Sequence, residues 1–158
     1  MKLFGVRDSI VIHAPIERCF LLSTSVALVQ KTLGMKPVAG RTSGHVVGGD
    51  TVRWQGWQLG FPNYHVSLIT EFEEPYHFRD RMIAGRFRSF EHDHRFEVMD
   101  GGVLLSDEVR FTMPFGVLGQ MVGTFVLVPH IRRLVRARFA MLKQLAESDA
   151  WRQYVETI

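Results

Sequence analysis

Two histidines, His92 and His94, stand two positions apart in the stretch RSFEHDHRFEV at residues 88–98. If this stretch is a strand, both imidazoles lie on one face together with Phe90 and Phe96, because successive side chains of a strand point to opposite faces. Imidazole titrates near neutral pH and can act as a general base, a metal ligand or a polar group in a pocket wall. The pattern leaves these three roles open.

Two carboxylates are placed beside these histidines by strand pairing. The turn Asp100-Gly101-Gly102 joins the stretch to VLLSDEVRFTM, in which Asp107 is the one charge on the face of Val109 and Phe111. The apolar faces of the two strands must both point to the core, and a regular three-residue turn would turn one of them outward. We therefore predict a bulged turn that pairs His94 with Asp107 and His92 with Val109.

The same reasoning applies at the preceding turn, Gly85-Arg86-Phe87. It pairs Asp80 with His92 and Phe78 with His94. Directly opposed side chains have Cβ atoms about 4.5 to 5.5 Å apart, which is close enough for an imidazole to donate to a carboxylate. We therefore expect each histidine to have a carboxylate neighbour on the inner face.

The elements that position these residues can be read along the chain. Residues 3–12 predict a first strand, and short helices are predicted over 15–22 and 25–33, the second ending at Gly34. Strand signals separated by turn residues then run from about residue 38 to 113, with one strand near 41–47. Residues 115–147 predict a long helix that Pro129 either kinks or divides in two.

Alternation assigns faces to two middle strands. In NYHVSLITEF the predicted inner residues are Tyr64, Val66, Leu68, Thr70 and Phe72, which turns His65 toward solvent. In YHFRDRMIAG the predicted inner residues include Phe78, Asp80 and Met82. The opposite face of this strand carries His77, Arg79 and Arg81 and is expected to be solvated, and on the next strand Asp93 lies on the face opposite the histidines.

Composition bounds the class of protein. The chain has 158 residues, 46% of them hydrophobic and 22% charged, which is typical of a globular protein with one core, so we predict a single domain over residues 1–158. The lone cysteine, Cys19, excludes an intramolecular disulfide and a cysteine-based zinc site. A reducing compartment fits this composition, and a cytoplasmic location is expected.

The net charge of +3 reflects a basic segment at residues 130–138. At helical spacing Arg132, Arg133 and Arg136 lie on one side and Arg138 on the other, with Ile131, Leu134 and Val135. A solvated helix face is the preferred interpretation. Peripheral contact with acidic lipid through this face is the alternative, and no nucleic-acid partner is expected.

The run FGVLGQMVGTFVLVP before this segment is apolar on nearly every side but shorter than a membrane span requires. We expect it to be buried against a sheet. Gly116, Gly119 and Gly123 would allow close approach to another backbone or leave space beside the helix.

The order of these elements, with IHAPIERCF, FRDRMIAGRFRSFEHDHRFE and LLSDEVRFTMPFGVLG, resembles the START and birch-pollen-allergen (SRPBCC) superfamily, in its bacterial cyclase/dehydrase-like or cell-division-inhibitor-like branch. The resemblance implies an α+β helix-grip fold, in which a curved antiparallel sheet of about seven strands wraps around a long C-terminal helix. It also implies a cavity for an apolar or amphipathic molecule between sheet and helix. A fold shared by carriers and by cyclases assigns no reaction.

Carried onto this chain, the resemblance gives two cavity walls. The sheet wall comprises Tyr64, Val66, Leu68, Phe78, Asp80, Met82, Phe90, His92, His94, Asp107, Val109 and Phe111. The helix wall comprises Phe115, Leu118, Val122, Phe125 and Val126. The alternative is that these side chains fill a solid core.

The preferred function is binding of a hydrophobic or amphipathic small molecule, such as a lipid, a quinone or a polyketide-like compound, with the His and Asp groups orienting a hydroxyl or carbonyl. The alternative is a cyclase or dehydratase in which His92 or His94 is a general base oriented by Asp80 or Asp107. A metal site at the His-x-His pair and an interaction role without ligand are weaker alternatives, so no metal or cofactor is predicted. The oligomeric state is left open.

Overall fold

The computed structural model describes residues 1–155, and the last three residues of the predicted domain, 156–158, lie outside this range. The described chain forms a seven-stranded antiparallel sheet, two short helices after the first strand and a long C-terminal helical segment. The strands are β1 (Phe4–Ile12), β2 (Met35–Gly40), β3 (Thr51–Gln58), β4 (Phe61–Glu73), β5 (His77–Gly85), β6 (Ser89–Met99) and β7 (Gly102–Thr112). The helices are α1 (Ile16–Ser23), α2 (Val26–Leu33), α3 (Gly116–Val122), the π-helical turn η1 (Gly123–Leu127), α4 (Val128–Ala146) and the 3-10 helix η2 (Asp149–Tyr154).

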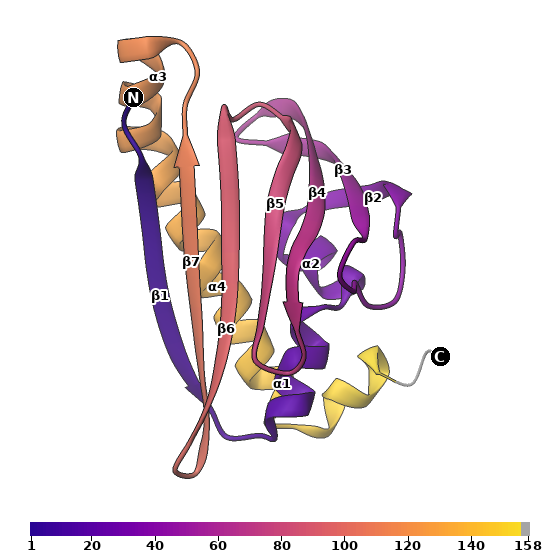
Figure 1. Cartoon of the computed structure of the whole chain (residues 1–158). Helices are drawn as coiled ribbons and strands as arrows, with labels where there is room; N and C mark the ends of the chain where they lie inside the picture. The colour runs from indigo at the N-terminus through magenta and orange to yellow at the C-terminus, as the bar shows by residue number, and fades with distance from the viewer. Residues whose placement is uncertain (156–158) are drawn as a thin grey trace.

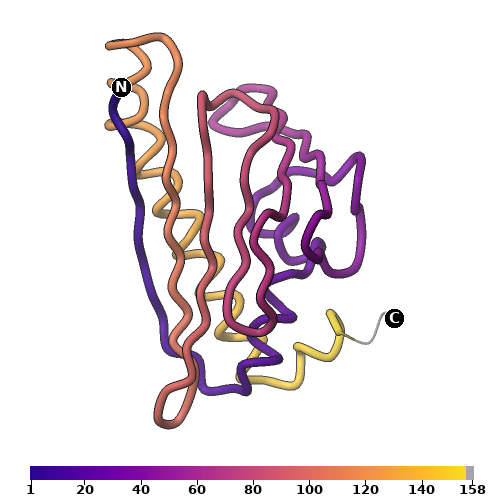
Figure 2. The backbone as a smooth tube through the Cα atoms, in the orientation of Figure 1, coloured from indigo at the N-terminus to yellow at the C-terminus, as the bar shows by residue number. Residues whose placement is uncertain are grey.

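The strands follow the order β1–β7–β6–β5–β4–β3–β2, and α4 crosses one face of the curved sheet diagonally (Figure 1). The tube in Figure 2 shows that the N-terminus lies beside α3, whereas α1 and η2 lie at the opposite end of the sheet. This arrangement confirms the predicted helix-grip fold.

The predicted pairing of the last strands is confirmed, but the predicted bulge is wrong, because Met99 pairs with Gly102 and only Asp100 and Gly101 form the turn. His94 lies opposite Asp107 and His92 opposite Val109 in β6 and β7. Asp80 lies opposite His92, and Phe78 opposite His94, in β5 and β6. The alternation of inward and outward side chains was enough to predict this pairing, because a one-residue slip would turn the whole apolar face of a strand outward.

The predicted strand near 41–47 is wrong, since β2 lies earlier, at Met35–Gly40. This strand is at the sheet edge, where the missing N–H of Pro37 breaks no essential ladder bond. Gly40, at φ 75°, then turns the chain into a loop, and a Cβ at this position would meet the Thr51 carbonyl oxygen. A proline within a short apolar run had hidden the strand.

The C-terminal segment contains an irregularity just before Pro129. Helix α3 passes into the π-helical turn η1, and Pro129 then stands in the first turn of α4. Proline has no N–H to donate and is tolerated there. The chain stays helical from residue 116 to 146, with the π-helical turn just before the proline, so Pro129 does not interrupt the segment.

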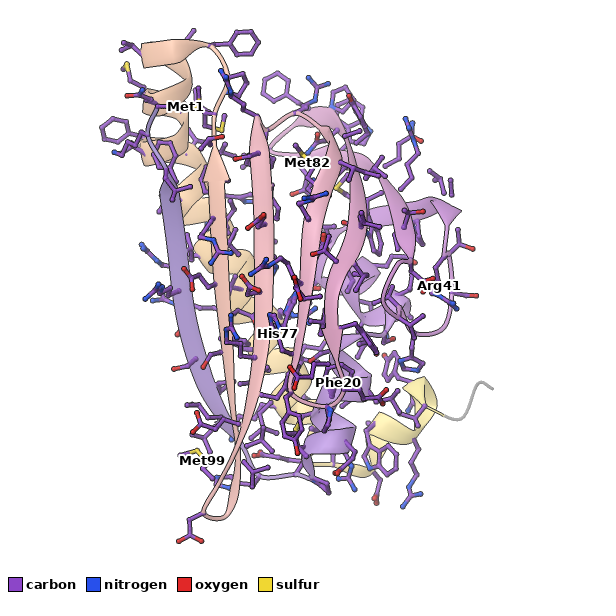
Figure 3. All side chains as sticks on the ribbon, viewed as in Figure 1. Met1, Phe20, Arg41, His77, Met82 and Met99 are labelled. Carbon is purple, nitrogen blue, oxygen red and sulfur yellow. The ribbon has the colours of Figure 1, made fainter. Side chains whose placement is uncertain are left out.

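The core beyond the cavity is packed by aromatic side chains. Phe20 of α1, labelled in Figure 3, makes edge contacts with Phe72, Phe78 and Phe96 of the sheet at centroid distances of 5.5, 5.6 and 5.2 Å. Cys19 is also buried, and burial raises the pKa of its thiol to about 11. Among residues 1–155 no helix is long and apolar enough to cross a membrane.

Candidate functional site

A cavity of about 570 Å³ lies between the sheet and the helices α2 and α4. This size suits a drug-sized or lipid-like molecule. The sheet contributes Val52, Trp54, Asn63, His65, Ser67, Ile69, Phe78, Asp80, Phe90, His92, His94 and Val109, and the helices contribute Ser23, Val26, Val29, Thr32, Leu33, Val122, Leu127, His130, Ile131, Leu134, Val135 and Arg138.

Several predicted wall residues are among these. Phe78, Asp80, Phe90, His92, His94, Val109 and Val122 face the cavity. They come from β5, β6, β7 and the helix, and the strand pairing just described brings their side chains to one surface.

The face assigned to β4 is wrong for its first half. His65, Ser67 and Ile69 face the cavity, so that Tyr64, Val66 and Leu68 are on the outer side. The pairing of β4 with β5 shifts twice, with Ile83 inserted on β5 and Thr70 inserted on β4. A bulged residue reverses the alternation that follows it, so Phe72 is nevertheless inside, against Phe20.

Three other predicted wall residues have different places. Met82 lies against Gly85 and does not line the cavity. Phe111 is fully buried and stacks on Phe4 at 5.0 Å, so it belongs to the solid core. Asp107 is behind the wall, where it binds the two histidines.

The predicted helix wall is also largely wrong. Phe115, Leu118 and Phe125 are 83%, 68% and 73% exposed, and Val126 is exposed as well. Helix α3 and η1 extend past the edge of the sheet (Figure 1), so an apolar stripe that resembles a core face has no sheet beneath it. The helix wall is instead built mainly by α2 and α4.

The histidines and Asp107 form a hydrogen-bonded cluster. His92 Nε2 donates to Asp107 Oδ2 at 2.9 Å, and His94 Nδ1 donates to Asp107 Oδ1 at 3.2 Å. His94 also stacks on Phe78, with 4.2 Å between the ring centroids. Because a carboxylate only accepts, these bonds assign the proton of His94 to Nδ1 and leave Nε2 as an acceptor.

Burial sets the charges of this cluster. It lowers the pKa of His94 to about 3, and the nearby His92 acts in the same direction while Asp107 opposes it, so His94 is neutral at neutral pH. Burial alone would raise the pKa of the Asp107 carboxyl group, but His94 and His92 outweigh it and the pKa lies below its usual range. Asp107 is therefore an anion.

Arg138 places a positive charge beside the Asp107 carboxylate. Its position on the inner face of α4 agrees with the helical spacing. Its Nε lies 3.8 Å from Asp107 Oδ2, and its guanidinium donates to the Ser23 carbonyl oxygen at 3.1 Å. Burial lowers the pKa of Arg138, while Asp107 and Asp80 raise it. An arginine keeps its charge under such shifts. Sequence reasoning found the face but gave Arg138 no role.

Three buried polar atoms have no hydrogen-bond partner within residues 1–155, namely Ser23 Oγ, Asp80 Oδ1 and Arg138 Nε. All three residues line the cavity. Buried polar groups are normally paired, since an unpaired one costs about 1–3 kcal/mol. The mostly apolar cavity wall thus holds one donor, one acceptor and one hydroxyl without a partner among the described residues.

His65 and His130 were missed as cavity residues. His65 was predicted to face solvent, but its ring lies at 5.2 Å from Phe90, and burial lowers its pKa while Asp80 raises it. His130 bonds Gln58 across the cavity rim at 2.9 Å. The irregular strand pairing hid the first, and no spacing signal marked the second.

The donor set could also hold a metal ion, because ligand atoms of His92, His94 and Asp107 lie within 4.8 Å of one another. Two features argue against this use. Both oxygens of Asp107 already accept from these imidazoles, and the Arg138 guanidinium beside them would repel a dication.

The opposite face of the sheet carries a separate ionic cluster. Asp93 is 1% exposed there and accepts from His77 Nε2 at 2.7 Å, Arg79 Nε at 2.9 Å and Arg110 at 2.6 Å. Asp93 lies on the face that the alternation assigned to it, and the long side chains of Arg79 and Arg110 cover its carboxylate there.

No protein-family model and no curated protein sequence matches the chain. Solved structures do. A protein from Thermus thermophilus has a TM-score of 0.70 at 18% identity, over 89% of this chain and 94% of its own. A START superfamily protein from Mycobacterium smegmatis has a TM-score of 0.67 at 14% identity, over 89% and 98%. Ara h 8.0201 has a TM-score of 0.64 at 12% identity, over 92% and 98%. The chain therefore has the START-like helix-grip fold.

Proposed function

We propose that the protein binds an amphipathic small molecule in the cavity, with the molecule's polar end beside Arg138 and Asp80. The observation that carries this proposal is the set of three unpartnered buried polar atoms on residues that line a mostly apolar cavity. The START superfamily likeness supports a hydrophobic-ligand role in general. We place this activity in the cytoplasm, as the lone cysteine favours.

The polar atoms indicate which head group would fit. Arg138 Nε is a donor and suits a carbonyl oxygen, whereas Asp80 Oδ1 is an acceptor and suits a hydroxyl. The Nε2 atom of His94 is a second acceptor. A ligand with a carbonyl and a hydroxyl close together, on an apolar body, satisfies the Arg138 donor and one of the two acceptors, and a hydroxy-ketone is such a molecule.

The depth of the polar cluster gives the ligand a direction. His94 is five positions along β6 from Ser89, at the end of the sheet near α3, which corresponds to roughly 17 Å of strand. Nearer that end the lining includes the apolar Phe87, Phe90 and Leu127, with Gln58, Arg86 and His130 at the rim. The polar end is therefore bound deep and the apolar body extends toward α3.

The test is a thermal-shift series with three compounds of one chain length: a straight-chain hydrocarbon, its 2-ketone and its 4-hydroxy-2-ketone. A ligand that binds only the folded state at a hundred times its Kd stabilises by about 2.7 kcal/mol. We expect stabilisation to increase along the series, and Ser67→Phe, which fills the cavity, to abolish it. Equal, negligible shifts for all three compounds, with no molecule co-purifying in native mass spectrometry, would contradict the proposal.

A second candidate is a cyclase or dehydratase, which the Asp107–His94 pair favours. A neutral imidazole that is held by a carboxylate in the cavity wall has the arrangement of a general base. Turnover of a poly-β-keto substrate that is lost in His94→Gln, while the ketone still binds, would favour this enzyme over a carrier.

A further inference from the structure

One end of the molecule exposes an unusual amount of apolar surface. Phe61, Phe115, Val117, Leu118 and Phe125 are each between 68% and 83% exposed. Contiguous apolar patches of this kind mark interaction sites in soluble proteins. The β4 and helix residues come from segments far apart in the sequence.

The sheet register brings four segments to this end. Phe4 pairs with Phe111, Ser89 with Thr112, and the β3–β4 turn lies between Gln58 and Phe61. Met1, labelled in Figure 3, lies beside α3 at the end opposite Met99. We call the four segments at this end, residues 1–5, 56–64, 84–90 and 112–133, the apolar tip.

The cavity reaches the apolar tip. Leu59, Phe61, Arg86, Val122 and Leu127 line the cavity and belong to the tip, and Leu59, Phe61 and Val122 are exposed as well. Side chains that are in both the cavity wall and the surface mark its mouth. An apolar molecule that enters or leaves the cavity thus passes the exposed side chains of Leu59, Phe61 and Val122.

The charges of the apolar tip all have one sign. It contains five Lys and Arg residues, Lys2, Arg86, Arg88, Arg132 and Arg133, and none of the 16 Asp and Glu residues. All five are exposed, and none makes an ion pair within the described part of the chain. Arg136, the third arginine of the predicted basic face, is instead paired with Asp8 at 3.5 Å. The apolar tip therefore carries five exposed positive side chains and no acidic side chain of its own.

We propose that the apolar tip docks on an anionic lipid membrane, so that the cavity mouth opens into the bilayer interface. Insertion of apolar side chains with Lys and Arg at the headgroups is the established physics of interfacial binding. A second copy of the chain fits less well, because two tips would bring ten positive charges together without an acidic partner. Exchange of a ligand between cavity and bilayer rests on the proposed function, whereas docking itself does not.

Gly123 fixes the helix that carries much of this surface. A Cβ at Gly123 would lie 2.6 Å from the Phe4 ring, so the glycine lets η1 rest on the end of β1. The exposed face of α3 and η1 is therefore held in place beside the mouth by a packed contact.

The test is flotation of the purified protein with vesicles of phosphatidylcholine alone and of phosphatidylcholine with phosphatidylglycerol. We expect binding to the anionic vesicles that weakens as salt is raised. The variant Leu118→Ser/Phe125→Ser, and separately Arg86→Gln/Arg88→Gln, should each weaken binding roughly tenfold or more. Circular dichroism melting checks that these surface variants remain folded.

Matched controls use the opposite end and the outer face. Val98→Ser/Met99→Ser removes exposed apolar side chains from the β6–β7 hairpin, and Arg95→Gln removes an exposed charge. Both should bind vesicles as the parent does. The proposal is overturned if the parent stays unbound, if tip and control variants weaken equally, or if sedimentation shows that the tip instead forms a dimer.

The two proposals are separated by the cavity-filled variant. Ser67→Phe should still float with anionic vesicles but lose ligand binding. Flotation without any ligand response in the parent would defeat the proposed function and leave docking intact. Ligand response without flotation would defeat docking alone.

Discussion

His94 and Asp107 face each other across β6 and β7, and the imidazole Nδ1 donates to the carboxylate Oδ1 at 3.2 Å. The stack of His94 on Phe78 fixes the plane of the ring, so its remaining nitrogen is aimed by two independent contacts. Asp107 also accepts from His92 and lies beside Arg138. One carboxylate thus orients the polar groups of the cavity.

Replacing Asp107 by Asn should destabilise the fold strongly. The amide has one acceptor for two imidazoles and leaves the buried Arg138 cation without its nearby anion. Removal of one member of a buried ion pair costs about 3–5 kcal/mol. Urea denaturation measures the change. Asp8→Asn is the control, because Asp8 is the strand neighbour of Asp107 on β1 but forms its ion pair with Arg136 at the surface. Loss of a surface ion pair should cost about 0–1 kcal/mol.

Stability should fall as the pH is lowered below about 6.5, the ordinary pKa of histidine. Burial lowers the pKa of folded His94 to about 3. Between pH 6.5 and this value the imidazole is protonated in the unfolded chain and neutral in the folded chain. More protons in the unfolded state means that stability rises with pH over this window. The loss should be about 1 kcal/mol between pH 6.5 and 5.5.

The variant that isolates this contribution is His94→Gln, which cannot titrate. Its stability, although lower at neutral pH, should depend less on pH between 5.5 and 6.5 than that of the parent. His13→Gln, which removes an exposed imidazole outside the cavity, is the control variant. Parallel pH profiles for the parent and His94→Gln would show that His94 is not the group responsible.

The sequence predicted the part of the site that lies on regular strands. Phe78, His92, His94 and Asp107 are joined by short hairpin turns and by one consistent apolar face, so parity determined their neighbours. Asp107 stood out because it was the one charge on that face. These residues needed no knowledge of distant parts of the chain.

The errors have two physical causes. On β4, the bulge at Thr70 reverses the alternation between Ile69 and Phe72, and nothing in NYHVSLITEF marks it. In α3 and η1, Leu118 and Phe125 repeat as core residues do, yet they are exposed. Periodicity shows that a stripe is apolar, but whether a sheet or another surface covers it depends on how far the sheet extends.

The buried carboxylate on the outer face should be a stability element independent of the cavity. Burial alone would raise the pKa of Asp93, but Arg79, His77 and Arg110 outweigh it and the pKa lies below its usual range. Asp93→Asn should cost on the order of 2 kcal/mol at neutral pH. This difference should shrink in acid, because the stability that an acid with a lowered pKa contributes is lost as the pH falls below its unfolded value of about 4.

Glu91→Gln is the matched control for Asp93, because Glu91 also accepts from Arg110, at 3.1 Å, but is partly exposed. Its effect on the free energy of unfolding should be within about 1 kcal/mol of zero. Equal losses for Asp93→Asn and Glu91→Gln would mean that burial of the carboxylate contributes nothing special.

Arg138→Met should separate recognition of the polar end from binding of the apolar body. Methionine keeps the length and the apolar stem of the side chain but removes the donor beside Asp80. A lost hydrogen bond to a charged group costs about 1.5–3 kcal/mol, which is a factor of about 10 to 150 in Kd. Calorimetric titration should show this loss for the hydroxy-ketone and almost none for the hydrocarbon. Arg136→Met, which changes an exposed arginine of the same helix, should leave both affinities unchanged. An equal loss of affinity for both compounds in Arg138→Met would mean that Arg138 supports the cavity wall and does not bind the polar head group.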